Sequence, residues 1–215
     1  MFKLKNIHLQ IENKNILSID TLNISAKSKA LILGPSGCGK TTLLHVMAGL
    51  RHLQDGIVSF NGVDTQNLKG SEVDTFRGQN FGFVFQNFHL LKHLTLEQNI
   101  RLAAFGAGVK TNNDRLNKLL KAFHLSDKIK QKASSLSHGE AQRAAIIRAV
   151  IHKPKVIFAD EPTSSLDDEN TAQVIRMLEE QADSTGAMLI VATHDKRIKN
   201  RFTTSINLKD GKIVK

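Results

Sequence analysis

The sequence has no long hydrophobic run and little cysteine, proline or aromatic residue. Its 215 residues include one cysteine, Cys38, and three prolines, with no tryptophan or tyrosine. A single cysteine excludes an internal disulfide and agrees with a reducing compartment. No apolar run approaches the ~18 residues that a membrane span requires, and residues 1–5, Met-Phe-Lys-Leu-Lys, lack the apolar stretch of a signal peptide. We therefore expect a cytoplasmic protein without a membrane span.

Acidic residues are fewer than basic residues. Twenty Asp and Glu stand against thirty Lys and Arg, which gives a formal net charge of +10. This excess suits an anionic partner such as a nucleotide, a nucleic acid or an acidic membrane face, although it also serves solubility. The net charge alone does not show which of these partners the protein binds. There is no long block of like charge and no Pro-, Ser- or Gly-rich linker, so no disordered tail is expected.

Hydrophobic periodicity predicts an α/β protein. The first sixty residues are rich in β pattern, residues 88–151 are mostly helical, and apolar strands alternate with helices after 152. Such alternation implies a mainly parallel core sheet with crossover connections. We predict one domain over 1–215. Within it, 1–87 and 152–215 form the core, with an antiparallel β part near the N-terminus, and 88–151 form a helical subdomain.

The individual elements can be placed from the same pattern. A helix is expected to begin at Thr95, with a cap completed by Gln98. The other expected helices cover 42–48, 113–123, 137–150 and 167–182. Expected strands cover 2–4, 9–11, 16–24, 30–33, 57–60, 81–86, 156–159, 188–192, 205–208 and 212–214, with a break at 13–15 and a tight turn at 61–62.

The most informative segment is residues 34–41, Gly-Pro-Ser-Gly-Cys-Gly-Lys-Thr, which matches the P-loop pattern G-x-x-x-x-G-K-[ST]. A glycine-rich turn between a buried strand and a helix lets backbone N–H groups converge on an anion, and the helix dipole adds positive charge. Lys40 would contact the β- and γ-phosphates, and Thr41 would offer its hydroxyl to Mg²⁺. The segment therefore predicts a nucleoside triphosphate site rather than a glycine loop that merely ends a strand.

A second motif places two carboxylates at the end of an apolar strand. Val156-Ile157-Phe158-Ala159 leads directly into Asp160 and Glu161. In a P-loop protein the first carboxylate belongs beside Mg²⁺, and the adjacent Glu161 can orient or deprotonate an attacking water. Alone, such a pair is equally compatible with a helix cap or a solvated turn. Beside a P-loop it predicts transfer of the γ-phosphoryl group to water.

Residues 136–143, Leu-Ser-His-Gly-Glu-Ala-Gln-Arg, carry a family resemblance. Together with Phe85-Gln86, residues 160–163, residues 165–167 and Thr193-His194-Asp195, they make the chain resemble the ATPase subunit of an ABC transporter. The motifs arrive in the family's order and run from the P-loop to Asp195. Residues 81–91, Phe-Gly-Phe-Val-Phe-Gln-Asn-Phe-His-Leu-Leu, and the short length most resemble the lipoprotein-releasing and macrolide-export branch.

The resemblance implies an ATP-sandwich dimer in which two cassettes meet head to tail, with ATP and Mg²⁺ as ligands. It implies a catalytic role for Glu161, His194 and Lys40, and contact of Asp167 with the other subunit. It implies metal contacts for Thr41, Gln86 and Asp160. Nucleotide contacts would come from Ile11, Gly34, Pro35, Ser36, Gly37, Cys38, Gly39, Lys40, Thr41, Thr42 and Gln86 of one chain and from Ser137, Gly139 and Glu140 of the other.

The chain departs from the family pattern at four positions. His138 replaces the usual third-position glycine of the signature, Ser165 stands where alanine is common, and Lys92 stands where this branch often has proline. By resemblance, Ile11 occupies the position of the aromatic residue that stacks on adenine. We therefore expect modest ATP affinity and poor discrimination against GTP.

Plainer roles are available for several of these residues. Ser137 can serve as a helix N-cap, and His194 in isolation reads as a satisfied polar residue. His89 and His93 stand four apart, as metal ligands on a helix face would, but no third ligand stands in register. The segment is expected to pack against a permease instead. Cys38 is interpreted as a small loop residue that reagents can alkylate rather than as a redox sensor.

From these motifs we expect the ATP-hydrolysing subunit of an ABC transporter, and the branch resemblance implies an exporter. Its expected partners are a second copy of itself and integral membrane permease subunits, which would hold it on the inner face of the cell membrane. One alternative is a regulatory ATPase that signals through a membrane partner without transport. Another is a soluble ABC protein acting on nucleic acid, but such proteins usually carry two cassettes or a long coiled-coil insert, and no nucleic acid partner is expected.

Overall fold

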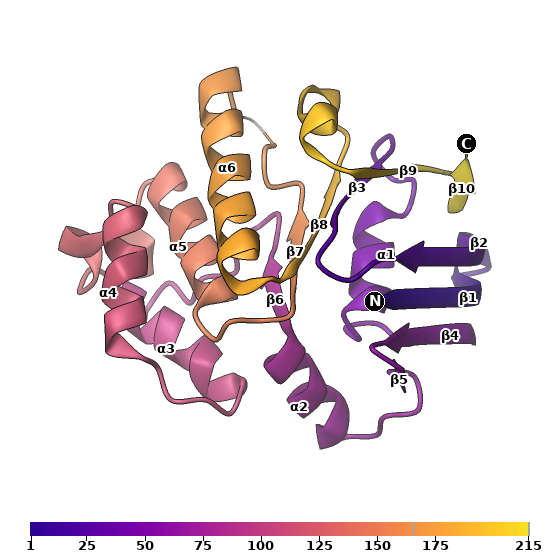
Figure 1. The fold of residues 1–215 in the computed structure, drawn as a ribbon, viewed down its shortest axis with the longest axis horizontal. Helices are drawn as coiled ribbons and strands as arrows, with labels where there is room; N and C mark the ends of the chain where they lie inside the picture. The colour runs from indigo at the N-terminus through magenta and orange to yellow at the C-terminus, as the bar shows by residue number, and fades with distance from the viewer. Residues whose placement is uncertain (165, 215) are drawn as a thin grey trace.

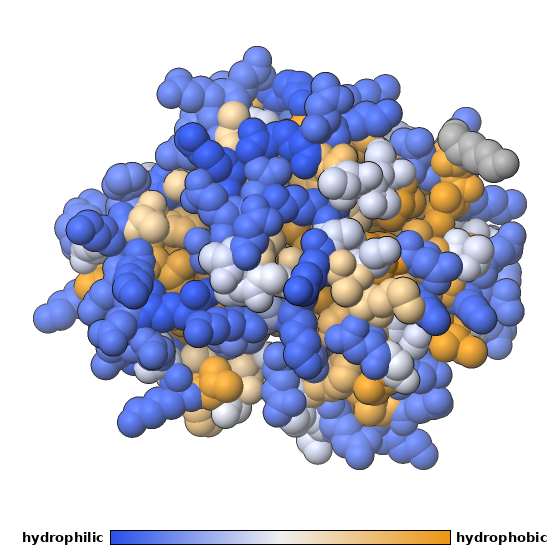
Figure 2. Space-filling view, viewed as in Figure 1, coloured by the Kyte–Doolittle hydropathy of each residue, from blue (hydrophilic) through white to orange (hydrophobic). Residues whose placement is uncertain are grey.

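The computed structural model describes residues 1–164 and 166–214, so Ser165 of the resemblance lies outside the described residues. Helices α3, α4, α5 and α6 gather on one side, a six-stranded sheet runs through the middle, and a four-stranded sheet lies on the other side (Figure 1). Hydrophilic side chains cover most of the face seen in this view (Figure 2). No helix in the described part of the chain is both long enough and apolar enough to cross a membrane.

The central sheet has the strand order β10-β9-β3-β8-β7-β6, and its pairs are parallel except for the terminal hairpin of β9 and β10. Strands β7 and β8 are buried at every residue, because layers cover both faces of a parallel sheet. This confirms the predicted parallel core. Its strands are β3 (Lys29–Leu33), β6 (Phe81–Val84), β7 (Val156–Asp160), β8 (Met188–Thr193), β9 (Thr204–Lys209) and β10 (Lys212–Val214).

The second sheet is antiparallel, as predicted, with the order β2-β1-β4-β5. It consists of β1 (Phe2–Ile11), β2 (Lys14–Ile24), β4 (Asp55–Phe60) and β5 (Val63–Asp64). The predicted turn at Asn61 and Gly62 is confirmed, with φ of 51° and 88°. The break predicted at 13–15 is present, but it lies one to two residues earlier. The chain reverses at Glu12 and Asn13, where φ is 48° and 61°, and pairing resumes at Lys14.

Six α-helices are present among the described residues. They are α1 (Lys40–Met47), α2 (Ser71–Asn80), α3 (Leu96–Gly106), α4 (Asn113–Ala122), α5 (His138–Val150) and α6 (Asp168–Thr185), with short 3₁₀ turns at Ser126–Lys128, Ala133–Ser135 and Lys196–Arg201. The predicted cap of α3 is confirmed, because the Gln98 N–H donates to the Thr95 hydroxyl and the Thr95 N–H donates to Gln98 Oε1. Residues 88–94, however, form no helix, and His89 has a φ of 48°. Helix α2 was not predicted.

The central sheet separates two hydrophobic cores. Along β3, Leu31 and Leu33 face the core shared with α3 to α6, whereas Ala30 and Ile32 face the core shared with α1 and the antiparallel sheet. This alternation follows from the two-residue period of a strand. Helix α1 is thus held between the two sheets, and the loop that precedes it is anchored at the carboxyl end of β3.

Candidate nucleotide site

The P-loop joins β3 to α1, as its pattern predicts. Gly37 and Gly39 have φ of 77° and 104°, in the left-handed region that favours glycine. A Cβ on Gly34 would lie 2.2 Å from the Leu208 carbonyl oxygen, so only glycine fits beside β9. No side chain caps the start of α1 at Gly39. The first backbone N–H groups of α1 are therefore available to an anion.

The ammonium of Lys40 is held inside this loop. Its Nζ donates to the carbonyl oxygens of Gly34 at 2.8 Å and Pro35 at 3.0 Å, and it lies 3.3 Å from Glu161 Oε1. Both partners of the ion pair are buried. The pair joins the P-loop to the end of β7, two segments that lie 120 positions apart in the sequence. It therefore brings the predicted phosphate-binding lysine and the predicted catalytic carboxylate into one site.

The Glu161 carboxylate is held by residues at the end of the neighbouring strand, β8. Its Oε2 accepts the hydroxyl proton of Thr193 at 2.8 Å and contacts His194 Nδ1 at 3.0 Å. Its backbone has a φ of 46°, an uncommon value for a residue with a side chain, and such conformations persist where the surroundings hold them. The Glu161 carboxylate thus contacts Thr193 and His194, whereas that of Asp160, adjacent in sequence, interacts with Thr41.

The electrostatics keep Glu161 ionised. Burial raises the pKa of its carboxyl, but the hydrogen bonds from Thr193 and His194 and the charge of Lys40 outweigh burial and hold the pKa below its ordinary value. A group with such a pKa carries its negative charge at neutral pH. It can accept hydrogen bonds from a bound water, which is the requirement for orienting a nucleophile.

Asp160 lies in a different environment. It is 3% exposed, and burial raises the pKa of its carboxyl, a shift that interaction with the Thr41 hydroxyl and the charge of Lys40 partly oppose. Within residues 1–164 and 166–214, its Oδ1 atom is buried without a hydrogen-bond partner. A buried carboxylate oxygen of this kind is costly unless it meets a donor or a cation. The arrangement of Asp160 and Thr41 therefore fits a divalent cation with oxygen ligands.

A purely protein-made metal centre has no support. No group of three or more His, Cys, Asp or Glu side chains in the described part of the chain is arranged to hold an ion. His89 and His93 do not share a helix face, because residues 88–94 are not helical. A cation beside Asp160 would thus complete its coordination with hydroxyl, phosphate or water oxygens, as Mg²⁺ commonly does.

These groups surround one cavity of about 370 Å³. Its lining includes predicted nucleotide, metal and catalytic residues, and Ile11 and Ile16 add an apolar wall. The predicted residues Gly34, Pro35, Cys38 and Asp160 are not among the residues that line it. The lining residues are Ile11, Ile16, Ser36, Gly37, Gly39, Lys40, Thr41, Thr42, Gln86, Glu161 and His194. Residues from β1, the P-loop, the segment after β6 and the ends of β7 and β8 thus meet, although they are far apart in the sequence.

The signature residues lie outside this cavity. The Ser137 N–H donates to Glu140 Oε2 at 2.8 Å, and the Glu140 N–H donates to the Ser137 hydroxyl at 3.3 Å, so the two form a capping box at the start of α5. The plain reading of Ser137 as an N-cap is therefore confirmed. The backbone hydrogen bond from Ser137 and the nearby Lys128 lower the pKa of Glu140. Neither Ser137 nor Gly139 lines the cavity around the P-loop.

Three features add to or correct the predicted site. Thr193 was noted only as part of a motif, yet it supplies the shortest hydrogen bond to Glu161. Gln142 is buried and donates its side-chain amide to the Pro162 carbonyl, which joins α5 to the segment after Glu161. Cys38 is 5% exposed and packs in the core beneath the loop, so the expectation that reagents reach its thiol is wrong.

Comparison with known proteins agrees with this geometry. The ABC transporter family pattern matches residues 17–164. The lipoprotein-releasing system ATP-binding protein LolD of Bacteroides thetaiotaomicron is 36% identical over the whole of both chains. The LolD protein of Syntrophus aciditrophicus is 38% identical over 90% of this chain and 87% of its own. The macrolide export ATP-binding/permease protein MacB of Burkholderia pseudomallei is 36% identical over 94% of this chain but only 31% of its own length.

The solved structures that resemble this chain are also ABC transporter cassettes. The dimeric structure of MJ0796, a bacterial ABC transporter cassette, has a TM-score of 0.91 and 31% identity, and covers all of this chain and 97% of its own. A post-hydrolysis dimer of the same cassette, bound to ADP and Pi, has a TM-score of 0.90 over the same extents. The family match covers more than half of the chain, and the P-loop and the paired carboxylates agree with it. The chain therefore belongs to the ABC transporter family of ATP-hydrolysing cassettes, in the branch that contains LolD and MacB.

Proposed function

We propose that the chain is the motor subunit of a membrane transporter, in which two copies enclose ATP and the hydrolysis of that ATP drives a separate permease. The observation that carries the proposal is the position of Glu161. Its carboxylate is ionised, fixed by Thr193 and His194, paired with Lys40, and open to the cavity that the P-loop lines. This is the arrangement required to place a water against a bound γ-phosphate.

In the proposed reaction each side chain has a separate task. Lys40 neutralises charge on the β- and γ-phosphates, since its ammonium already lies within the loop. Glu161 orients the attacking water and accepts its proton. His194, which is 57% exposed and bonded to Glu161, is free to turn toward the γ-phosphate and stabilise its charge. Thr41, Asp160 and Gln86 would hold Mg²⁺, which would supply positive charge to offset that of the phosphate groups.

The second copy would supply what the first lacks. The start of α5 presents the N–H groups of His138 and Gly139, which come before the first intrahelical hydrogen bonds. With the Ser137 hydroxyl, they form an anion-binding helix terminus that does not line the cavity of its own chain. A head-to-tail dimer places this terminus of one copy over the P-loop of the other. The dimeric structures of the related cassette support this assignment.

A membrane partner fits a groove of about 400 Å³ that is lined by Phe85, the residue before Gln86. The groove lies between the core and the helical part of the chain, and Ala103 and Gly106 of α3 line it. The residues that precede these two in the sequence, Leu102 and Phe105, are exposed and apolar, and Phe105 is 80% exposed. Exposed aromatic side chains beside an apolar groove are typical of a protein interface. The lining residues are Ala48, Leu50, Asp74, Arg77, Gly78, Phe81, Gly82, Phe83, Phe85, Ala103, Gly106, Arg148, Ala149 and His152.

We propose that a cytoplasmic segment of a permease docks in this groove and holds the chain against the inner face of the membrane. Arg148 donates to the carbonyl oxygens of Phe88 and His89, both at 2.6 Å, and it also lines the groove. The loop after Gln86 is thereby tied to α5, so that a partner in the groove would sense the state of the nucleotide site. The names of the relatives, lipoprotein-releasing and macrolide export, favour export as the direction.

The replacement Glu161→Gln tests this function. The amide keeps the shape of the side chain but cannot accept a proton, so turnover should fall about 10²–10⁴-fold while ATP still binds. With ATP and Mg²⁺, the variant should accumulate as a dimer in size-exclusion chromatography with light scattering. Glu180→Gln is the control, because Glu180 is exposed on α6 and lies outside the cavity. Near-normal hydrolysis by Glu161→Gln, or a monomer in saturating ATP, would disprove the proposal.

A further inference from the structure

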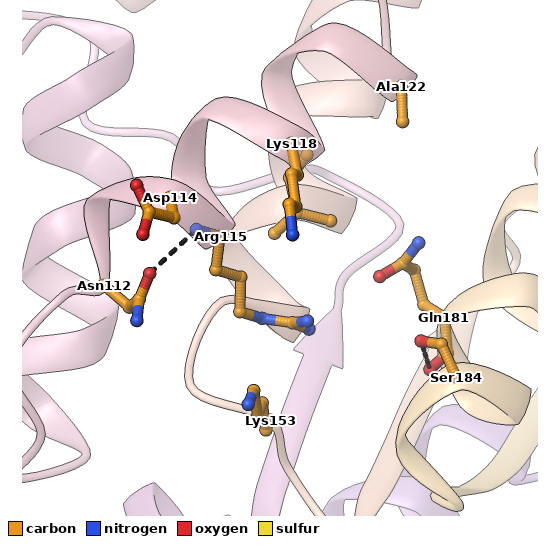
Figure 3. A pocket seen from close by; sticks show the side chains of 9 residues that line it. Asn112, Asp114, Arg115, Lys118, Ala122, Lys153, Gln181 and Ser184 are labelled. Atoms are coloured by element: carbon orange, nitrogen blue, oxygen red, sulfur yellow. Dashed lines mark hydrogen bonds between the residues drawn. The ribbon is translucent and has the colours of Figure 1, made fainter.

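A second cavity, of about 480 Å³, lies away from the nucleotide site, between α4, the connection from α5 to β7, and the last turns of α6 (Figure 3). It shares no lining residue with the cavity around the P-loop. The residues that line it are Asn112, Asp114, Arg115, Lys118, Leu119, Ala122, Lys153, Gln181 and Ser184. The catalytic proposal assigns no task to any of them.

The charge around this cavity is unbalanced. Three cations, Arg115, Lys118 and Lys153, line it, and Asp114 is the one carboxylate among the lining residues. Within residues 1–164 and 166–214, neither lysine side chain forms an ion pair or a hydrogen bond, and Asp114 pairs with none of the three cations. Arg115 and Lys118 lie on α4, and Lys153 lies on the connection from α5 to β7. Cations gathered around one cavity repel one another, and a bound anion would relieve that repulsion.

Arg115 is held in place before any ligand arrives. Its Nε donates to the Ile151 carbonyl at 3.2 Å and its Nη2 to the Val150 carbonyl at 2.8 Å, both at the end of α5. Burial lowers the pKa of the guanidinium. In the part of the chain that the structure describes, Nη1 forms no hydrogen bond. Arg115 therefore offers an oriented donor that requires no rearrangement to meet an oxyanion.

The other walls add donors from two more elements. Lys153 follows α5 in the left-handed region, with a φ of 58°, and its N–H bonds to the Val150 carbonyl, so its backbone is fixed just before Pro154. Figure 3 shows Lys118 and Lys153 on opposite sides of the Arg115 guanidinium, with Gln181 across the cavity on α6. The amide of Gln181 can donate. The Ser184 hydroxyl already donates to the Gln181 backbone carbonyl at 3.0 Å.

We propose that this cavity binds a phosphate group, carried either by a small soluble compound or by a lipid headgroup. Arginine recognises phosphate through paired N–H donors, and lysine adds charge without strict geometry. The three cations line one cavity of about 480 Å³, which suits a compact tetrahedral anion rather than an extended polymer backbone. The proposal does not depend on the nucleotide cycle, since the site shares no residue with the catalytic cavity.

The test uses the full chain with its P-loop saturated by MgADP, so that the probe, inorganic phosphate, meets only other sites. Backbone amide NMR shifts are followed during titration in phosphate-free buffer. The double variant Lys118→Gln/Lys153→Gln is compared with Lys121→Gln/Lys155→Gln, which removes two exposed lysines outside the cavity and has the same net charge. Arg115 is left intact, because its bonds to α5 support the fold.

Phosphate should shift the amides of residues 112–118, 153 and 181–184 in the wild type, and the Lys118/Lys153 variant should bind at least about tenfold more weakly. The Lys121/Lys155 variant should bind like the wild type. Equal weakening in both variants, or no saturable shift at these amides, would overturn the proposal.

Flotation with vesicles identifies the source of the phosphate. Binding to vesicles of phosphatidylcholine with phosphatidic acid, lost only in Lys118→Gln/Lys153→Gln, would support the proposal with a lipid headgroup as the ligand. Saturable phosphate binding without such vesicle binding would support it with a soluble phosphate compound. Vesicle binding that both double variants lose equally would reflect general surface charge and would count against a lipid site.

Discussion

Replacing Thr193 with valine tests how the structure holds Glu161. Thr193 is completely buried, donates its hydroxyl to Glu161 Oε2 at 2.8 Å, and accepts the Asp195 N–H at 3.0 Å. Valine keeps nearly the same shape but can form neither bond. The substitution therefore removes one charge-assisted hydrogen bond and leaves one backbone donor without its partner.

The size of the effect follows from these two bonds. A hydrogen bond to a charged group contributes about 1.5–3 kcal/mol, and a buried donor left unpaired costs about 1–3 kcal/mol. Glu161 keeps its contacts with His194 and Lys40, so the lower ends of these ranges apply. We expect the free energy of unfolding at pH 7 to fall by about 2–3 kcal/mol. For a chain of this length the melting temperature should drop by about 4–12 °C.

The pH dependence separates the two bonds. Burial raises the pKa of Glu161, but the bonds from Thr193 and His194 and the charge of Lys40 hold it below the ordinary value of 4.5. A depressed carboxyl pKa contributes stability above the unfolded pKa, and this contribution is lost as pH falls through the folded pKa. The difference between wild type and Thr193→Val should thus be largest at neutral pH. The difference should shrink at lower pH, as the Glu161 carboxyl becomes protonated in both the wild type and the variant. What remains is the part due to the unpaired Asp195 N–H.

Urea unfolding followed by circular dichroism, at pH 7 and at several values down to about pH 4, measures both parts. Thr203→Val is the matched control, because its hydroxyl bonds the Lys29 carbonyl at the surface and no carboxylate. The control should lose little stability, with no pH dependence. A Thr193→Val variant as stable as this control, or one whose loss of stability is the same at every pH, would refute the account of Glu161.

Two further substitutions test the wall of the nucleotide cavity at Ile11 and the packing of the P-loop at Gly34. Ile11→Tyr should tighten ATP binding about tenfold in titration calorimetry, if a ring there recovers ~1.4 kcal/mol of stacking on adenine; unchanged affinity in a folded variant would place the base elsewhere. Gly34→Ala should lower the free energy of unfolding by about 1–3 kcal/mol, because its Cβ would meet the Leu208 carbonyl at 2.2 Å and the Cys38 Sγ at 2.6 Å. Gly106→Ala is its control, since a Cβ there meets nothing within 4 Å, and equal stability of the two variants would contradict the packing argument.

The sequence predicts those elements whose pattern is local. The apolar runs of β3, β7 and β8 indicate buried strands, and Thr95 with Gln98 indicates the start of α3. Helix α2 carries no such pattern. Its residues are mostly polar, no side chain caps it at Gly70, and Asn80 is its one buried residue. It packs beside α3 at Gly78, where a Cβ would lie 2.5 Å from the Gly106 carbonyl, a contact that only the tertiary structure determines.

The candidate site likewise combines features that the local sequence predicts with features that depend on the tertiary structure. The P-loop and the two carboxylates are recognisable because their chemistry requires particular residues at fixed spacing. The hydrogen bond from Thr193 to Glu161 depends on β7 and β8 being neighbours, with Asp160 paired to Ala192, and strand order is not a local property. The loop at 88–94 is likewise held by distant groups. Arg148 donates to the Phe88 and His89 carbonyls, and Asn99 forms hydrogen bonds with the backbone of Leu91. Because these bonds hold the loop, its apolar residues do not form the predicted helix.

The central claim is that Ser137 of one copy completes the nucleotide site of another, and Ser137→Arg tests it most directly. Ser137 lies at the start of α5 and does not line the cavity around its own P-loop. An arginine there should leave ATP binding by the single chain as tight as in the wild type, whereas Lys40→Ala should weaken it. In the Glu161→Gln background, Ser137→Arg should abolish the ATP-dependent dimer seen by light scattering. Loss of ATP binding by the isolated Ser137→Arg chain, or a dimer that still forms, would contradict the account.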